Sequence, residues 1–344
     1  MSLKELIMEI LTDGGKLLGL DIGFRNIKVF PEGKNHSKTV TYCNAVGGAP
    51  VQRIGDLEQL PVEERLVFEN GFSLGRWAIN FGRARHRIDA NWLLSEAWYH
   101  NFLGACAVAG VEDGDRIVAA IPIPLNEYAA YAPRLKKKLT GIHSFHLRGR
   151  EPVSFEVLPV IVAQLISGVY HQAFNISGHL QKDFDQGKNR LVIDPGGGTL
   201  GSAVLNGLSN NPDFIGSVPR SGYWEVINAC KSSIEECFEG ADTSALVLAD
   251  GVERKKWKHY GVEHDISELI EEKERELVAA HRQQLEQYPL ETVDEVLVIG
   301  GTGERLFDLY EEAFKPLTVT LGDNPRIANV VGAVKQVRSL LLEG

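Results

Sequence analysis

The chain has 344 residues, 44% of them hydrophobic and 24% charged, values that fit a folded globular protein and exclude a disordered or fibrous one. At roughly 100–200 residues per domain, this length predicts two domains. The formal net charge of −10 argues against a general nucleic-acid-binding surface, which needs clustered Lys and Arg. The one dense basic run, Arg254–Lys258, lies beside an acidic segment, so we expect a solvated face there.

The cysteines and the hydropathy pattern indicate a cytoplasmic protein. Cys43, Cys106, Cys230 and Cys237 show no CxxC spacing and no paired framework, which predicts reduced thiols. No apolar stretch approaches the ~20 residues of a membrane span, and the N-terminus lacks the pattern of a signal peptide. We therefore expect a protein that is neither secreted nor inserted in a bilayer.

The first residues predict an amphipathic helix. Its apolar face holds Leu3, Leu6, Ile7, Ile10 and Leu11. The charges on its other face roughly cancel, so an anionic lipid surface would gain little by binding it. We expect this helix to dock against the body of the protein or against a neighbouring subunit.

A hairpin is predicted over residues 16–30, where an apolar strand, a glycine-containing turn and an alternating strand follow one another. Asp21 stands at its bend. Prolines and glycines then interrupt residues 34–96, which predicts a small inserted subdomain that ends in a helix near 91–102.

Strands and helices alternate in the next part of the chain. A buried strand is predicted at 115–123, followed by a basic helix at 126–140. A short strand at 156–160 and an apolar helix at 162–174 come next. This alternation is typical of an α/β layer.

The hairpin pattern occurs a second time in the other half of the chain. An apolar strand at 190–194 stops at Asp194, which is followed by Pro-Gly-Gly-Gly-Thr. The next stretch, residues 202–207, has the pattern of a returning strand. We interpret this recurrence as an internal duplication.

Charged helical segments dominate the chain after Gly222. The longest predicted helix covers residues 267–287, with apolar residues along one face. We therefore predict a helical insertion over 223–290.

The last predicted strand, residues 294–299, ends in the run Gly300–Gly303. A helix is expected to begin at about Glu304. A C-terminal helix at 328–342 closes the chain.

Three glycine-rich turns, each directly after an apolar strand, indicate phosphate binding. Glycine lets backbone amides approach phosphate oxygens, and successive N–H groups in such turns form anion-binding nests. Asp21 and Asp194 add a carboxylate at two of the turns, and two carboxylates facing a triphosphate would hold the waters of a Mg²⁺ ion. Lys28, seven residues after Asp21, would reach a β- or γ-phosphate as a point charge.

The second turn also satisfies the dinucleotide pattern GxGxxG, through Gly196, Gly198 and Gly201. That motif requires a helix to begin at the turn. Residues 200–205 have the pattern of a strand instead, so the context excludes a Rossmann site. The sequence contains no GxxxxGK[ST] phosphate loop either.

The three turns resemble the nucleotide motifs of one superfamily. LDIGFRNIKVF, within residues 19–30, resembles the first phosphate motif of the actin, sugar-kinase and DnaK-chaperone superfamily. LVIDPGGGTLGSAV resembles the second phosphate motif, and VLVIGGTGERL resembles the adenosine motif. Spacing and length are most similar to the bacterial actin-like ATPases of the ParM/StbA type.

The resemblance implies an α/β, two-lobed actin-like fold of duplicated ribonuclease-H-like domains with small inserted subdomains. The first lobe would cover residues 1–188, with the inserted subdomain at 34–96. The second lobe would cover 189–326 with its helical insertion, and residues 327–344 would return to the first lobe. ATP and Mg²⁺ would bind between the lobes.

The resemblance also assigns roles to residues. The first phosphate motif would contribute Asp21, Gly23, Asn26 and Lys28. Asp194 would position Mg²⁺ and the attacking water, with both aspartates near the metal. The β- and γ-phosphates would contact Gly196, Gly197, Gly198 and Thr199. The ribose and adenine would contact Gly300, Gly301, Thr302 and Gly303.

Two positions depart from the family pattern. A Gln or Glu usually begins the helix after the 156–160 strand and orients the hydrolytic water, but the alignment places Val160 there. The position seven residues after Asp194, often Asp or His in relatives, is Gly201. Gln164 is the nearest polar candidate for catalysis, although a buried, hydrogen-bonded glutamine of purely structural role fits equally well. We therefore expect tight nucleotide binding with slow hydrolysis.

The resemblance implies a polymerising ATPase that segregates plasmid DNA or positions another cargo. Its partners would be further copies of itself and a DNA-binding adaptor protein, without direct contact to nucleic acid. Two alternatives remain open: a small-molecule kinase of the same superfamily, and a nucleotide-gated scaffold that does not hydrolyse ATP. The sequence leaves the choice between ATP and GTP open as well.

Overall fold

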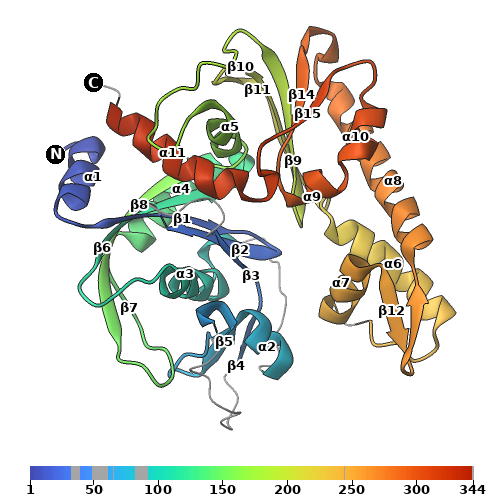
Figure 1. Ribbon diagram of the computed structural model, residues 1–344, viewed down its shortest axis with the longest axis horizontal. Helices are drawn as coiled ribbons and strands as arrows, with labels where there is room; N and C mark the ends of the chain where they lie inside the picture. Colours follow the sequence, from blue (N-terminus) through green and yellow to red (C-terminus); the bar gives the residue numbers. More distant parts are fainter. Residues whose placement is uncertain (32–38, 49–60, 65, 82–91, 244, 343–344) are drawn as a thin grey trace. The chain divides into compact units, whose positions relative to one another are not determined.

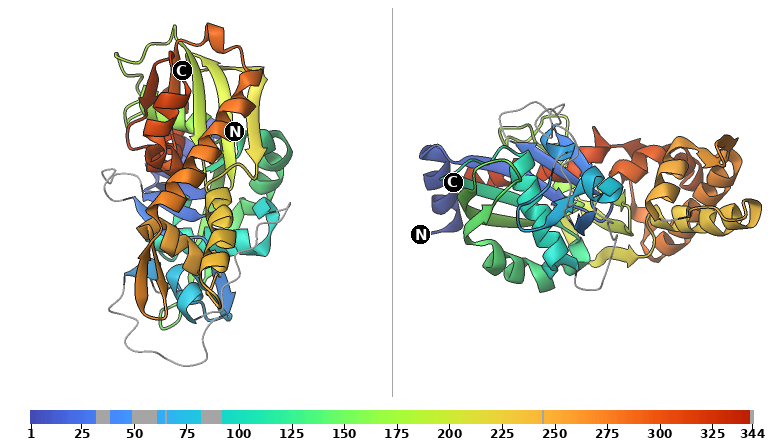
Figure 2. Two further views of the ribbon diagram at one scale, coloured as in Figure 1. Left: turned by 90° about the vertical axis from the view of Figure 1, so that its right-hand side faces the viewer. Right: turned by 90° about the horizontal axis from the view of Figure 1, so that it is seen from below.

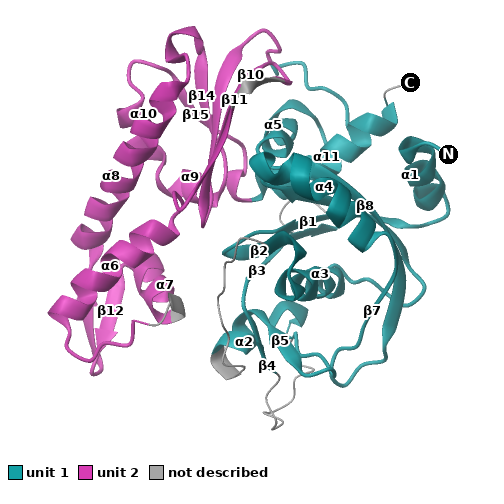
Figure 3. Cartoon of the chain, turned by 180° about the vertical axis from the view of Figure 1, so that it is seen from behind, with its two compact units in different colours: residues 1–184, 327–344 teal, residues 185–326 magenta. Residues whose placement is uncertain are grey.

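The computed structural model describes residues 1–31, 39–48, 61–64, 66–81, 92–243 and 245–342 (Figure 1). The chain forms two compact units, coloured separately in Figure 3. Unit 1 contains residues 1–184 and 327–344, and unit 2 contains residues 185–326.

Unit 1 is built on a six-stranded sheet. In spatial order its strands are β3 (Val40–Cys43), β2 (Asn26–Pro31), β1 (Lys16–Ile22), β6 (Arg116–Ile123), β8 (Val153–Ala163) and β7 (Gly141–Phe145). The three strands β1, β2 and β3 form an antiparallel meander, β6 and β8 run parallel to β1, and β7 is antiparallel to β8. Beside this sheet, β4 (Val46–Gly48) and β5 (Phe72–Leu74) form a small antiparallel pair.

Helices cover both faces of this sheet. They are α1 (Leu3–Thr12), α2 (Gly75–Phe81), α3 (Glu96–Val108), α4 (Leu125–Leu139), α5 (Ile166–Ala173) and α11 (Ala328–Leu342), with short 3₁₀ turns at Val62–Glu64 and Trp92–Leu94. Successive side chains of a strand point to opposite faces. Leu18 and Leu20 of β1 accordingly join a core with α3 and α4, whereas Leu17 joins a second core with α1 and α11.

The predicted N-terminal helix forms and docks on unit 1 itself. Ser2 and Glu5 make reciprocal side-chain to backbone bonds at the start of α1, the capping box that fixes a helix N-terminus. Ile7 and Ile10 are buried in the core shared with α11. Figure 2 shows α1 beside the C-terminal end of α11.

Unit 2 is built on a five-stranded sheet whose order repeats that of unit 1. Its strands, in spatial order, are β11 (Ser209–Pro219), β10 (Thr199–Asn206), β9 (Asn189–Pro195), β14 (Glu295–Val298) and β15 (Val319–Leu321). Again three strands form an antiparallel meander and two more run parallel to its first strand. The internal duplication predicted for one hairpin therefore extends over five strands.

The remaining elements of unit 2 are mostly helical. They are α6 (Trp224–Cys237), α7 (Ala245–Arg254), α8 (Ser267–Gln284), α9 (Gly301–Arg305) and α10 (Phe307–Ala313), with 3₁₀ turns at Leu285–Gln287, Leu290–Thr292 and Pro325–Ile327. The predicted insertion at 223–290 is not wholly helical, because β12 (Lys256–His259) and β13 (Val262–Asp265) form a hairpin within it. None of the described helices in either unit is long and apolar enough to cross a bilayer.

The basic run at 254–258 is neutralised by nearby acids. Arg254 forms an ion pair with Asp250 at 2.8 Å, and Lys255 forms one with Glu271 at 3.1 Å. These side chains are 41–65% exposed, in agreement with the solvated face predicted from the sequence.

The structure corrects several boundaries in unit 1. The segment predicted as a small subdomain from residue 34 contributes β3 to the main sheet, because its alternating residues pair with β2. The helix expected near 91–102 is α3, at Glu96–Val108. Much of the predicted 34–96 subdomain, namely residues 34–38, 49–60, 65 and 82–91, lies outside the described residues.

The strand predicted at 156–160 and the helix predicted at 162–174 also change. The strand is β8, which runs from Val153 to Ala163, and the helix α5 begins only at Ile166. Val160 therefore lies inside a strand. The apolar residues after it continue that strand because they are buried on both faces of the sheet, a pattern that periodicity cannot separate from a buried helix.

Helices α5 and α11 lie side by side in Figure 1 and contact each other closely. A Cβ atom at Gly332 of α11 would lie 1.6 Å from the backbone oxygen of Ser167 in α5. Only glycine permits this approach between the two helices.

We predict that Gly332→Ala destabilises the protein by about 2 kcal/mol or more, because overpacking a close helix contact forces the backbones apart. The direction of this change distinguishes a close helix contact from an ordinary helix position, because Gly→Ala inside an ordinary helix raises stability by about 1 kcal/mol. Urea unfolding measures the change. Gly187→Ala is the control, because its added Cβ would meet only a flexible carboxylate at 3.3 Å. A Gly332→Ala protein as stable as the wild type would contradict the prediction.

Candidate functional site

Asp21 is the centre of the predicted site in unit 1. It lies near the end of β1 and is 2% exposed. Lys28 stands opposite it on β2, with its Nζ 3.0 Å from Asp21 Oδ2. Gln164 donates from Nε2 to Asp21 Oδ1 at 3.1 Å. The hairpin therefore supplies the acid and the ammonium group, and the end of β8 supplies the amide.

The turn between β1 and β2 is fixed by residues that the sequence did not reveal. Asn44 donates from Nδ2 to the carbonyl oxygen of Gly23 at 2.8 Å, and its backbone N–H donates to the carbonyl of Arg25 at 2.9 Å. Asn101, buried in α3, donates to Asn44 Oδ1 at 2.9 Å. A Cβ at Gly23 would lie 2.9 Å from the oxygen of Asn26, so this tight turn requires glycine.

The structure places Gln164, and not Val160, between β8 and helix α5. Gln164 follows β8 directly, and its backbone N–H donates to the carbonyl of Ile123 in β6 at 2.7 Å. Because β8 extends beyond its predicted strand to Ala163, the residue that follows it is Gln164 and Val160 lies inside it. A polar side chain thus follows the strand after all, and it contacts Asp21.

Unit 2 places Asp194 at the matching position, one residue before the end of β9. The residue opposite it on β10 is Gly201, which has no side chain. Chain segment 220–224 supports the intervening glycine turn: Arg220, Tyr223 and Trp224 donate their backbone N–H groups to the carbonyls of residues 198, 196 and 197 at 2.8–3.1 Å. Because these carbonyls are occupied, the turn is held in one conformation.

The glycine run at 300–303 lies against the same turn. Gly300 has φ +83°, a conformation that favours glycine, and a Cβ there would lie 2.2 Å from Asp194 Oδ1 and would displace this carboxylate. Thr302 donates from Oγ1 to the carbonyl of Gly196 at 3.3 Å. The helix expected to begin at about Glu304 begins at Gly301, within the run itself.

A buried glutamate of α8 connects the two glycine segments. Glu274, 6% exposed, accepts a 2.6 Å hydrogen bond from Tyr223 and another from Nε of Arg305 at the end of α9. The Arg305 guanidinium also stacks on the Tyr223 ring, 4.9 Å from its centre. No sequence signal distinguishes Glu274 from the many other charged residues of its helix.

His281 lies about two helical turns after Glu274 in α8 and is fully buried. Its Nε2 donates to the carbonyl of Ser221 at 2.8 Å, so its Nδ1 accepts from the Tyr310 hydroxyl at 2.6 Å. Burial lowers the pKa of His281 to about 4, although the Ser221 hydrogen bond opposes that shift. The neutral ring therefore holds the segment that supports the glycine turn at 196–198.

Each unit thus gathers part of the predicted site. Unit 1 brings together Asp21, Lys28 and Gln164 beside the Gly23 turn, with Asn26 at the start of β2. Unit 2 brings together Asp194, the turn from Gly196 to Thr199 and the run from Gly300 to Gly303. The described residues include no group of three or more His, Cys, Asp or Glu side chains that could hold a metal ion directly. Single carboxylates suit Mg²⁺, which keeps most of its water ligands.

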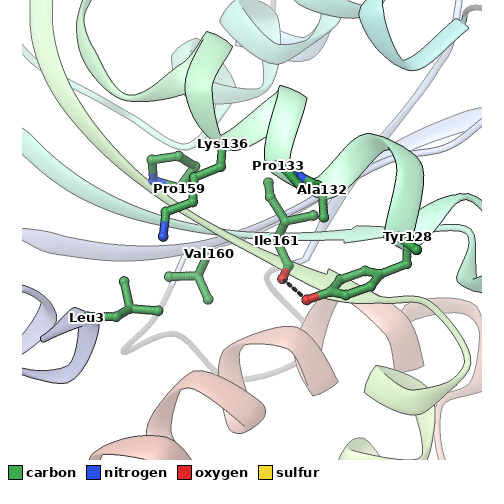
Figure 4. Close-up of a pocket in the computed structure, with 9 residues that line it drawn as sticks. Leu3, Tyr128, Ala132, Pro133, Lys136, Pro159, Val160 and Ile161 are labelled. Carbon is green, nitrogen blue, oxygen red and sulfur yellow. Dashed lines mark hydrogen bonds between the residues drawn. The ribbon is translucent and has the colours of Figure 1, made fainter.

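A separate pocket of about 360 Å³ lies in unit 1, between α4, β8 and the first residue of α1 (Figure 4). Val160 lines it together with Leu3 and Ile161, whose carbonyl accepts from Tyr128 at 3.2 Å. The Val160 side chain therefore belongs to this apolar pocket, whereas Gln164 contacts Asp21.

We predict that the protein loses stability as the pH falls from about 6.5 to about 4, because His281 must charge when it unfolds. The pKa of His281 is lowered in the folded state, so the unfolded state binds more protons in this range and stability rises with pH. The expected contribution at pH 5 is a loss of about 2 kcal/mol relative to pH 7.

Urea unfolding at pH 7 and pH 5 measures this loss. His281→Gln should unfold more easily at pH 7 but show a smaller difference between the two pH values than the wild type. The exposed His179→Gln variant should keep the wild-type difference. An equal loss in wild type and His281→Gln would show that another group causes it.

No protein-family model matches the sequence, and no curated protein compared with it matches either. Solved structures match nearly the whole chain. A ParM filament of 15 strands from Clostridium botulinum matches with a TM-score of 0.79 at 15% identity, over 94% of this chain and 99% of that one. The archaeal actin homolog Ta0583, in complex with ADP, matches at 0.73 and 17% identity, over 96% and 100% of the chains.

The actin-like protein Alp7A is similar as well, with a TM-score of 0.71 at 17% identity over 95% of this chain and 97% of that one. At such identities the likeness shows the fold. The repeated strand order of the two units is the duplication that this fold contains. The predicted fold class is confirmed: the chain has the actin-like fold of duplicated ribonuclease-H-like domains that the ParM proteins have.

Proposed function

We propose that this protein binds ATP with Mg²⁺, polymerises into filaments and hydrolyses the nucleotide slowly. The observation that carries the proposal is the matching position of Asp21 and Asp194, each one residue before the end of the first strand of its sheet. Both aspartates stand beside a glycine-dependent turn. A fold that repeats an acidic bend in this way is suited to a ligand with both a metal and phosphates.

Each group of residues would have its own task with the nucleotide. The backbone amides around Gly23 and those of Gly197 and Gly198 would bind phosphate oxygens, whereas the Gly196 N–H closes the turn by donating to the carbonyl of Thr199 at 2.8 Å. Lys28, which pairs with Asp21, would form its ion pair with a phosphate instead. Bound Mg²⁺ would neutralise phosphate charge, with Asp21 and Asp194 holding its waters. Gly300–Gly303 would contact the ribose and adenine. Gln164 would orient the attacking water, and Asp194 would accept its proton.

Of the two sequence arguments for slow hydrolysis, only the glycine at position 201 remains. The absence of a polar residue after β8 no longer supports it, because Gln164 stands there. The position opposite Asp194 is still Gly201, so β10 offers no side chain to help position the water.

Polymerisation is proposed from the similar structures. One is a ParM filament, another is an Alp12 filament, and a third is a ParM mutant described as non-polymerisable. With a net charge of −10, direct binding to DNA is unfavourable, so a cytoplasmic role in plasmid segregation would need a DNA-binding adaptor. Positioning of another cargo would use the same filament.

We predict that light scattering and negative-stain microscopy reveal filaments with ATP and Mg²⁺, but not with ADP or without nucleotide.

The Asp194→Asn variant should bind ATP and release phosphate about a hundredfold more slowly than the wild type, because the substitution removes the proton acceptor. Asp183→Asn is the matched control, since Asp183 is an exposed acid of the other unit.

The alternatives give different results in the same assays. ADP production that requires an added sugar, without polymer at high protein concentration, would favour a kinase. Polymers that form with ATP but never release phosphate would favour a scaffold. A chain that binds no nucleotide would refute the proposal.

A further inference from the structure

A strained turn follows Gln164. Leu165 has φ +69° and ψ −54°, and the N–H of Ile166 donates to the carbonyl of Gln164 at 2.8 Å. These values describe a γ-turn of the rarer, positive-φ kind, which is strained for any residue except glycine. A branched, fully buried leucine adopts this conformation only where its surroundings enforce it.

Asn329 holds Leu165 in this conformation. Its Oδ1 accepts the backbone N–H of Leu165 at 3.0 Å, and both residues are buried. Asn329 is the second residue of α11, which is anchored against α5 by the close approach at Gly332. Without this acceptor the Leu165 N–H would be buried and unsatisfied, and the turn would relax toward negative φ.

The turn decides where Gln164 points. Gln164 is held on one side by its N–H bond to Ile123 in β6 and on the other by the γ-turn. Its side chain then meets Asp21 at 3.1 Å. A change of φ at Leu165 would rotate the peptide that directly follows Gln164, and so move its side chain away from Asp21.

We propose that Asn329 is a positioning residue for hydrolysis, which acts through Leu165 and Gln164 on the water at the phosphate site. The inference rests on the proposed function, because it assigns Gln164 the task of orienting that water. The positioning residue lies in the C-terminal helix, 165 residues after Gln164 in the sequence.

Steady-state kinetics with Mg²⁺ and ATP test the proposal. Asn329→Ala should lower kcat about tenfold or more and leave KM within about twofold, because small displacements of an orienting group slow the reaction without weakening binding. Asn329→Asp should keep kcat near the wild-type value, since its carboxylate still accepts the Leu165 N–H. Gln336→Ala, elsewhere on α11, is the control for general loosening of the helix.

A double mutant separates an indirect role from an independent one. If Asn329 acts through Gln164, the Gln164→Ala, Asn329→Ala protein should have the same kcat as Gln164→Ala alone. A further tenfold loss in the double mutant, or equal changes in kcat and KM in the single one, would overturn the proposal.

Amide hydrogen exchange gives a readout that needs no nucleotide. Exchange at Leu165 should be at least tenfold faster in Asn329→Ala than in wild type, and close to wild type in Asn329→Asp. If the wild type fails to hydrolyse ATP, the proposed function falls while this exchange result still stands. Unchanged exchange in Asn329→Ala would show that Asn329 does not hold the turn.

Discussion

The buried carboxylate of Asp21 imposes the main constraint on unit 1. A charge at 2% exposure is stable only if opposite charge and hydrogen bonds replace its lost water. Lys28 and Gln164 provide both, one from the neighbouring strand and one from the end of β8. The hairpin register, the length of β8 and the turn at Leu165 must therefore all be correct for this carboxylate to be accommodated.

The duplicated sheets carry different chemistry at equivalent positions. Lys28 stands opposite Asp21, whereas Gly201 stands opposite Asp194. Gln164 follows β8 and donates its N–H to the neighbouring strand, and Gly322 does the same after β15. The acid of unit 1 thus faces a charged side chain across its hairpin, and the acid of unit 2 faces glycine.

The sequence predicted the hairpins and the terminal helix well because their signals are local. An acid and a glycine at a strand end identify the two bends, and α11 begins and ends where its apolar pattern does. Local signals could not place Gln164, since the length of β8 is set by its pairing with β6. They could not reveal Asn44, Asn101 or Asn329 either, because an asparagine has meaning only through the backbone group it reaches in the folded chain.

The inserted segment of unit 2 supports the glycine turn beside Asp194. Glu274 and His281 lie on one helix, and they fix the segment 221–223 through its tyrosine and through a backbone carbonyl. That segment in turn holds the carbonyls of the glycine turn beside Asp194. Truncation of Glu274 would leave the donors of Tyr223 and Arg305 without this acceptor, so a change in the insertion would reach the turn as well.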